Sequence, residues 1–183
     1  GLKEAKRNGA KVLAITNVVG SSIAREADNV VYTWAGPEIA VASTKAYTTQ
    51  MVILYLIAID MAYKFGKMTR EEYVQDIDDL YALRPLVEKM LTYNKQIKEI
   101  ANVVKTSHSM FYLGRGLDFL IAVEGALKSK EISYIHSEAF ASGELKHGTI
   151  ALIEEGVPVI INLTQESLIE KSISNIKEVA ARG

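Results

Sequence analysis

Short apolar runs alternate with longer amphipathic stretches along this chain of 183 residues. Four of the runs have the length and apolar character of buried strands, and the first is rich in β-branched residues. They cover residues 11–17, 29–36, 109–116 and 157–163. Because strands and helices alternate in this way, we expect an α/β fold with parallel sheets covered by helices.

The stretches between these strands have helical periodicity. The predicted helices are one ending at Asn8 and Gly9, a short one up to residue 27, a long one over 43–65, a charged region over 71–105, one after Gly116 and a last one over 166–182. Within the charged region we interpret Pro85 as the start of a new helix, because proline fits the first helical position. Residues 136–150 are expected to form a loop or a short helix.

The strand–turn–helix layout recurs before and after residue 67, which suggests two related halves. Active sites of parallel α/β sheets lie where the carboxyl ends of strands lead into helices. Two segments occupy such points, AGPEIAVAST at 35–44 and LGRG at 113–116.

Composition narrows the class of protein. The chain is 49% hydrophobic and 23% charged with a net charge of -1, and it lacks the strongly basic character of nucleic-acid or anionic-membrane binding. It contains no cysteine, which excludes disulfides and a thiolate nucleophile and fits the reducing cytoplasm. The longest apolar run, 51–59, is too short to span a bilayer, so we interpret it as part of a core helix. We expect neither a nucleic acid nor a membrane as a partner.

The stretch EGALKSKEIS carries its charges in an unusual place. At about 100° per residue, Glu124, Lys128 and Glu131 fall within an arc of about 60° on a helical wheel. Leucines and isoleucines lie around these charges, within an arc of about 140°, whereas the opposite side carries small residues. We therefore expect both sides of this helix to be packed, with Lys130 pointing to solvent.

Two interpretations of this row of charges stay open. On an exposed helix, Glu124 and Lys128 would form an ordinary ion pair four residues apart. On an apolar face, charges are costly unless paired and their pKa values move easily, which is typical of acid–base groups in a functional site. The position on the wheel favours the second interpretation.

Other polar residues are weaker candidates. His147 lies between the two glycines of GELKHG, which indicates an exposed loop that can reach a ligand or a partner subunit. His108 and His136 have no such context, and no pair of histidines has the spacing of a metal site, so we expect no metal and no cofactor. Ser43 and Thr44 are most simply interpreted as helix N-caps.

The same residues carry a resemblance to a known family. EGALKSKEISYIHSEAFASGELKHGTIALI, at 124–153, resembles the isomerase part of the glutamine:fructose-6-phosphate amidotransferases, or glucosamine-6-phosphate synthases. TNVVGSSIAREAD and AGPEIAVASTKAYTTQ resemble the first sugar-isomerase (SIS) subdomain of that family. The resemblance implies three-layer SIS-type parallel sheets flanked by helices. Residues 1–66 would be the C-terminal half of the first SIS subdomain, and 67–183 a second one without its C-terminal end.

The family makes glucosamine 6-phosphate from fructose 6-phosphate and ammonia released from glutamine, the first step of hexosamine synthesis. By resemblance, Glu131 would be the base that moves a proton between C1 and C2 of the sugar, and Lys128 and Glu124 would tune and position it. His147 would assist opening of the sugar ring in the neighbouring subunit's site, which implies a homodimer.

Val41 and Ser43 would contact the sugar phosphate. The resemblance also implies a glutaminase domain with an N-terminal cysteine, a Ser/Thr-rich phosphate loop before residue 1 and an imine-forming lysine after residue 183. We therefore expect these residues to be a piece of a longer chain and to be inactive alone. Two alternatives are another SIS-type phosphosugar isomerase or deglycase, and a non-catalytic sugar-phosphate sensor.

Overall fold

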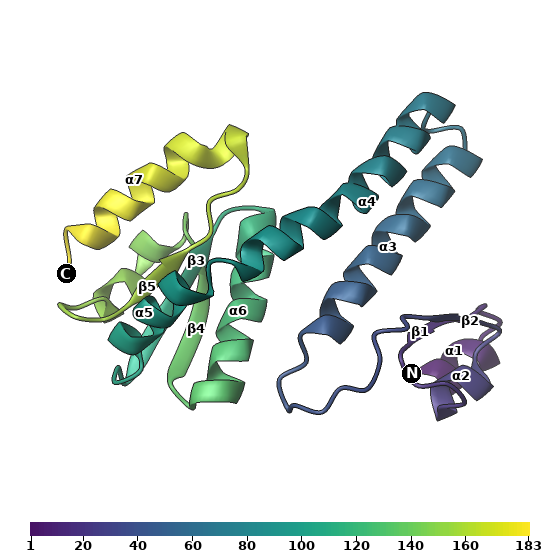
Figure 1. Cartoon of the computed structure of the whole chain (residues 1–183), viewed down its shortest axis with the longest axis horizontal. Helices are drawn as coiled ribbons and strands as arrows, with labels where there is room; N and C mark the ends of the chain where they lie inside the picture. Colours follow the sequence, from purple (N-terminus) through teal and green to yellow (C-terminus); the bar gives the residue numbers. More distant parts are fainter. The chain divides into compact units, whose positions relative to one another are not determined.

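The computed structural model describes residues 1–183, which form two compact units, Gly1–Thr92 and Tyr93–Gly183. Each unit contains parallel strands connected by helices (Figure 1). The predicted α/β class with helix-flanked parallel sheets is therefore confirmed.

The first unit has a two-stranded parallel sheet and four helices. Its elements are α1 (Leu2–Arg7), β1 (Leu13–Thr16), α2 (Ser22–Glu26), β2 (Asn29–Tyr32), α3 (Lys45–Lys64) and α4 (Arg70–Leu91). The strands pair in register from Leu13 opposite Asn29 to Thr16 opposite Tyr32. The two long helices, α3 and α4, pack side by side (Figure 1).

The predicted helix start at Pro85 is wrong, because α4 runs through this residue. A proline removes one helical hydrogen bond, here the one to the carbonyl of Tyr81. The residues around Pro85 are exposed, so water can satisfy that carbonyl. The helix instead begins after Thr69, whose hydroxyl accepts a hydrogen bond from the Glu72 N–H while the Glu72 carboxylate accepts one from the Thr69 N–H.

Helix α3 agrees with the predicted long helix. By length and composition alone it is able to cross a membrane, and it is the one helix of the structure that meets these criteria. Core helices of soluble proteins meet these criteria too, so the criteria do not distinguish a membrane-spanning helix from a core helix. The absence of a membrane partner stays a prediction.

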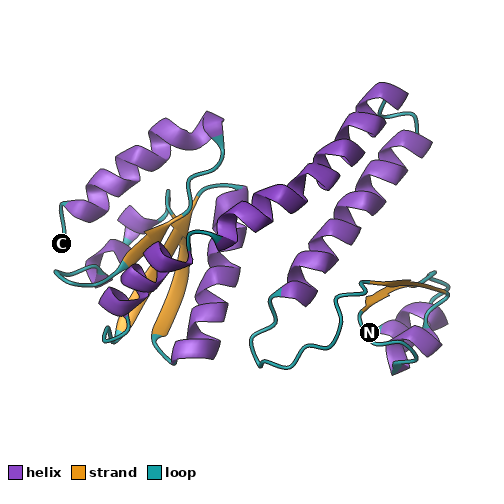
Figure 2. Ribbon diagram, in the orientation of Figure 1, coloured by secondary structure: helices purple, strands orange, loops and turns teal.

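The second unit has a three-stranded parallel sheet in the order β4-β3-β5, with helices on both faces (Figure 2). Its elements are α5 (Asn94–Val104), β3 (Ser109–Gly114), α6 (Leu117–Ser133), β4 (His136–Ala141), β5 (Val159–Ile161), α7 (Ile169–Ala180) and the 3-10 turns η1 (Leu145–His147), η2 (Thr149–Leu152) and η3 (Glu166–Leu168).

Central strand β3 is buried on both faces, as expected for a helix-covered parallel sheet. Met110 and Tyr112 pack on one face against small residues of α6. Phe111 and Leu113 pack on the other face in a cluster that includes Val179 of α7. The sheet thus holds α6 and α7 on opposite sides.

Strand β4 replaces the predicted loop or short helix at the start of 136–150. Its sequence, HSEAFA, is polar at its first three positions and does not read as a buried strand. Pairing with β3 from Ser109 opposite His136 to Gly114 opposite Ala141 supplies the backbone hydrogen bonds. Ser137 is fully buried there, and its hydroxyl donates to the Ile135 carbonyl. Residues 145–152 do form short helical turns.

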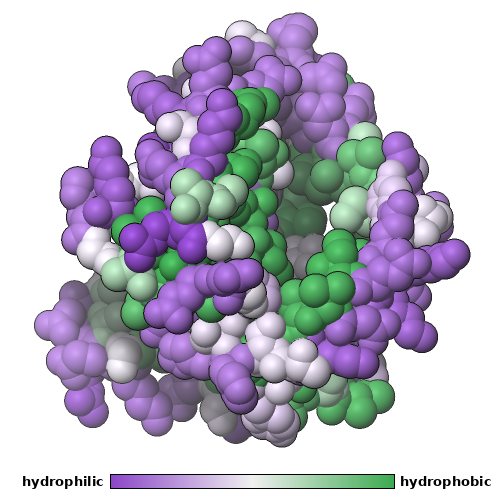
Figure 3. All heavy atoms as spheres, turned by 90° about the vertical axis from the view of Figure 1, so that its left-hand side faces the viewer, coloured by the Kyte–Doolittle hydropathy of each residue, from purple (hydrophilic) through white to green (hydrophobic).

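Many large apolar side chains are exposed in both units. Hydrophobic residues are visible at the surface among the hydrophilic ones (Figure 3). The most exposed include Ile39 at 94%, Val41 at 88% and Tyr134 at 91%.

Candidate active site

The three charges of α6 lie together, as the helical wheel predicts. Lys128 Nζ is 2.6 Å from Glu131 Oε2 and 3.5 Å from Glu124 Oε1. Residues three and four positions apart on a helix share one face, which produces this contact. The side chains of Lys128, Glu124 and Glu131 are 19%, 24% and 27% exposed, so water reaches the group only in part. We call Glu124, Lys128 and Glu131 the α6 ion trio.

The pKa of Lys128 is raised above its ordinary value. The hydrogen bond that its ammonium donates to Glu131 is the largest cause, partial burial opposes it, and the negative charges of Glu131 and Glu124 add to it. The ammonium therefore stays protonated at neutral pH. Because Lys128 is already protonated, the groups of the α6 ion trio that can accept a proton are the carboxylates of Glu124 and Glu131.

The apolar neighbours of the trio are exposed, which corrects the expectation that both sides of α6 are packed. Leu120, Leu127 and Ile132 are 59%, 41% and 66% exposed. Only the side with small residues is covered. Lys130 points to solvent as predicted. The trio thus lies on an uncovered apolar face, where an arriving ligand or protein surface would exclude water from it.

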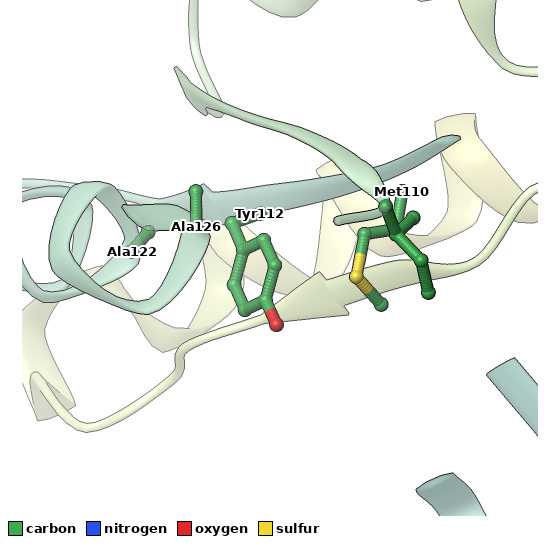
Figure 4. Packing of buried hydrophobic residues seen from close by; sticks show 5 residues of the cluster. Met110, Tyr112, Ala122 and Ala126 are labelled. Carbon is green, nitrogen blue, oxygen red and sulfur yellow. The ribbon is translucent and has the colours of Figure 1, made fainter. Parts of the chain in front are cut away.

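The small-residue side of α6 packs on β3 (Figure 4). Ala122 and Ala126 are 0% and 3% exposed, next to the Tyr112 ring. A Cβ at Gly125 would lie 3.1 Å from that ring, so glycine permits this close approach. The Tyr112 hydroxyl is hydrogen-bonded to Ser129. These contacts fix the helix on the sheet and leave the trio on its other side.

A buried aspartate holds the first turn of α6. Asp118 is 3% exposed, and its carboxylate accepts hydrogen bonds from the Thr164 N–H, at 2.9 Å, and from the Thr164 hydroxyl. Burial acts to raise the pKa of Asp118, but the hydrogen bonds from Thr164 and Gln165 outweigh it and hold the pKa below its ordinary value of 3.8. The start of α6 is thereby tied to the segment after β5.

Replacing Asp118 with asparagine is expected to destabilise the second unit by about 1.5–3 kcal/mol at neutral pH. Both carboxylate oxygens accept from donors, and an amide NH2 would face one of those donors. A group with a lowered pKa stabilises the fold above its unfolded-state pKa and loses this effect as the pH falls through the folded-state pKa. The urea midpoints of wild type and D118N should therefore differ most at neutral pH. The difference should shrink as the pH falls below 3.8.

Asp78→Asn is the matched control for this prediction, because Asp78 is exposed and makes no side-chain hydrogen bond. It should leave the urea midpoint unchanged at every pH. A D118N protein as stable as D78N at neutral pH would contradict the proposed contribution of the Asp118 carboxylate.

Arg115 connects the same turn to two further segments. Its Nε donates to Asn175 Oδ1 of α7 at 3.0 Å, and its carbonyl accepts from Gln165 Nε2 at 2.6 Å. Its guanidinium also lies against Gly143, in the segment that leads to His147. The contacts of the LGRG turn therefore help to position α6.

His147 ends η1 and is exposed, as its flanking glycines predict. Leu145, two residues earlier, is fully buried and anchors the turn. No hydrogen bond or ion pair joins His147 to the α6 ion trio. The structure thus presents the imidazole to the outside of its own unit, and its role stays a prediction.

Val41 and Ser43 lie in the loop between β2 and α3. Val41 is 88% exposed, and Ser43 is partly buried with no hydrogen bond from its hydroxyl. Thr44 is the N-cap residue of α3, as expected, but its side chain makes no cap hydrogen bond, and its N–H donates to Glu38 Oε1.

The first part of this loop is fixed by Asn17, which follows β1. Its Oδ1 accepts from the Thr33 hydroxyl and the Ala35 N–H, both at 2.9 Å. Its Nδ2 donates to the Gly36 carbonyl at 2.6 Å. One side chain thus ties the carboxyl end of β1 to the segment that leads to Val41.

An apolar cavity of about 470 Å³ lies between α5, β3 and α6 in the second unit. Lys128 contributes to its wall, but Glu124 and Glu131 do not. Its lining is almost wholly apolar, which does not suit a sugar phosphate. No three potential metal-binding side chains of the types His, Asp and Glu form a cluster in the structure.

Comparison with known proteins agrees with this geometry. The family model described as "SIS domain" matches residues 1–70 and 104–183. The chain belongs to the SIS domain family. The matched ranges of this SIS chain leave out most of α4 and all but the last residue of α5.

Named relatives of this SIS chain include glutamine–fructose-6-phosphate aminotransferases (isomerizing). That of Caldanaerobacter subterraneus is 59% identical over 182 residues and that of Thermococcus kodakarensis 49% over 183; each alignment covers all of this chain and 30% of the relative. The C-terminal domain of glucosamine-fructose-6-phosphate aminotransferase from Francisella tularensis has a TM-score of 0.96 at 41% identity, over all of this chain and 52% of that one. The chain thus spans about a third of the curated relatives it matches. The resemblance expected from the motifs is confirmed.

Several residues that position the candidate site residues within each unit were not found from the sequence. Asp118 and Arg115 sit in the noticed LGRG turn or next to it, but their partners are 46 and 60 residues away. Glu38 and Asn17 act on the backbone of a loop, and nothing in their local sequence indicates which amide or carbonyl they reach. The α6 ion trio did have a signal in the sequence, because its spacing is helical.

Proposed function

We propose that this chain is the isomerase part of a glutamine–fructose-6-phosphate aminotransferase, which converts fructose 6-phosphate and ammonia to glucosamine 6-phosphate. The observation that carries the proposal is the α6 ion trio, in which a protonated lysine bridges two partly shielded carboxylates. Isomerisation of a ketose to an aldose needs a base that moves a proton between neighbouring carbons. The trio offers such a base within a chain that aligns in full with aminotransferases of this name.

Glu131 takes the proton from C1 of the open-chain sugar and returns a proton at C2. Lys128 donates to Glu131 at 2.6 Å and fixes the direction of its carboxylate. Glu124 contacts the same ammonium from one turn away, which keeps Lys128 in place when the proton occupies Glu131. The step moves a proton and leaves the oxidation state of the sugar as a whole unchanged.

The remaining roles concern binding and ring opening. Val41 and Ser43 contact the sugar phosphate, and the unpaired Ser43 hydroxyl is free to hydrogen-bond a ligand oxygen. His147, exposed on η1, assists ring opening in the site of the neighbouring subunit of a homodimer. The glutaminase domain of the full-length chain supplies ammonia, in the cytoplasm. No nucleic acid or membrane takes part.

The full-length protein that contains this chain should form glucosamine 6-phosphate from fructose 6-phosphate with glutamine or an ammonium salt. Residues 1–183 alone should show no turnover, because the resemblance places the phosphate loop and the imine-forming lysine outside them. The measurement is product formation followed by NMR. Turnover by the isolated 183 residues would contradict the prediction. A full-length protein that binds the sugar phosphate without turning it over would favour the sensor. One that isomerises a different phosphosugar, or acts on one as a deglycase, would favour the other SIS enzymes.

A further inference from the structure

The loop between β2 and α3 is closed at its base by two side-chain contacts. Glu38 Oε1 accepts a hydrogen bond from the Thr44 N–H at 3.0 Å. Lys45 Nζ donates to the Pro37 carbonyl at 2.6 Å. The two contacts cross the neck of the loop in opposite directions, and residues 39–43 form its tip. We call this pair of contacts the Glu38–Lys45 clasp.

Both residues of the clasp occupy places that local helix chemistry alone does not explain. The side chain of the N-cap residue Thr44 makes no cap bond, and Glu38, six residues upstream, accepts from the Thr44 N–H, an amide at the helix end that has no partner within the helix. A negative charge is favourable at that end of a helix. Lys45 brings a positive charge to the same end, which is unfavourable. Its ammonium donates a hydrogen bond to the Pro37 carbonyl instead.

The clasp presents a tip with unused binding groups. Val41 is 88% exposed at its centre, the Ser43 hydroxyl makes no hydrogen bond, and Ala42 between them is buried at 7%. The burial of Ala42 and the clasp together determine which way Val41 and Ser43 point. Asn17 holds the segment just before the clasp through three hydrogen bonds.

We propose that the Glu38–Lys45 clasp sets the affinity for the sugar phosphate by holding the tip, residues 39–43, in its binding conformation. The proposal rests on the proposed function, in which Val41 and Ser43 contact the sugar. Fixing the backbone of each residue costs conformational entropy, and a loop that is already ordered does not lose it again on binding. Glu38 and Lys45 are positioning residues and do not touch the reacting atoms.

The test uses the full-length enzyme with Glu38 replaced by alanine or by glutamine. E38A removes the acceptor of the Thr44 N–H, so KM for fructose 6-phosphate and the Kd of glucosamine 6-phosphate should rise by about tenfold, equal to about 1.4 kcal/mol. Turnover at saturation should stay within about threefold, because the proton transfer is unchanged. E38Q keeps an acceptor oxygen and removes the charge from Glu38 Oε2, which is buried without a partner. It should therefore retain both the affinity and the stability of the wild type.

Glu71→Ala is the matched control, since Glu71 is exposed near the start of α4 and makes no side-chain hydrogen bond. An E38A enzyme with unchanged KM and Kd would overturn the clasp alone, because wild-type turnover would still support the proposed function. A fall in kcat without a rise in KM would overturn the positioning role and place Glu38 in the chemistry. An equal loss of affinity in E38Q would show that the affinity depends on the charge of Glu38 and not on its hydrogen bond to Thr44. That result would also overturn the positioning role of the clasp. A wild-type enzyme without turnover of fructose 6-phosphate would contradict both the proposed function and the role of the clasp.

Discussion

Replacing Glu131 with glutamine in the full-length enzyme is expected to lower turnover by about a hundredfold to ten-thousandfold, the usual contribution of a positioned general base. Glutamine has the shape of glutamate and keeps an oxygen that accepts a hydrogen bond from Lys128. The geometry of the α6 ion trio is thereby retained while the ability to take a proton is lost. Affinity for the sugar phosphate should change little.

Two measurements separate this loss from a loss of binding. Exchange of the C1 hydrogen of fructose 6-phosphate with deuterated water, followed by NMR, reports proton abstraction itself. Calorimetric titration with glucosamine 6-phosphate measures the affinity of the site for the sugar phosphate. Glu170→Gln on α7 is the matched control, because Glu170 is exposed and makes no ion pair or side-chain hydrogen bond. An E131Q enzyme with wild-type exchange and turnover would remove Glu131 from the role of base.

The same variant distinguishes the alternatives by what is lost. In another SIS-type isomerase it would also abolish proton exchange, but the product would not be glucosamine 6-phosphate. In a sensor the wild type would bind sugar phosphate without exchanging its hydrogens, and E131Q would make no difference. The outcome in wild type thus identifies the class of protein, and the outcome in E131Q identifies the residue.

Local periodicity was enough to predict the charged face of α6. The spacing of Glu124, Lys128 and Glu131 fixes their angular positions once the segment is a helix, and the contacts within the trio follow from that. Which side of the helix is covered depends on β3, and the wheel assigned packing to both sides. The apolar residues around the trio are uncovered in this structure, with Leu120 at 59% exposure.

Features that depend on distant partners were beyond a reading of the sequence. Strand β4 forms because β3 offers its edge, although the first three residues of HSEAFA are polar. Helix α4 continues through Pro85 because the helix around it is exposed and the lost hydrogen bond can be replaced by water. Glu38 reaches the amide of Thr44 only because the intervening loop folds back on itself. In each case tertiary contact decided what local preference left open.

Replacing Gly114 with alanine is expected to have the largest effect on the second unit. A Cβ at this position would lie 2.3 Å from the backbone carbon of Asp118 and 2.4 Å from its oxygen, much closer than real contacts allow. The end of β3 and the first turn of α6 approach each other here, and neither is free to move. Gly114 is paired in the sheet and accepts from the Ser142 N–H at 2.9 Å, while Asp118 is bonded to Thr164.

The expected loss for G114A is about 3 kcal/mol, the upper part of the usual range for overpacking, because backbone has to shift where a side chain cannot give way. Gly143→Ala is the matched control: its Cβ would meet the end of the flexible Arg115 side chain at 3.2 Å, so its cost should stay below about 1 kcal/mol.

Amide hydrogen exchange in the full-length protein measures the stability loss of both variants, since it resolves the stability of β3 and α6 from that of other regions. Protection of these two elements should fall in G114A and persist in G143A. Because α6 carries the ion trio, turnover should fall along with protection. Equal protection in the two variants would mean that the β3–α6 junction yields more easily than its contacts indicate.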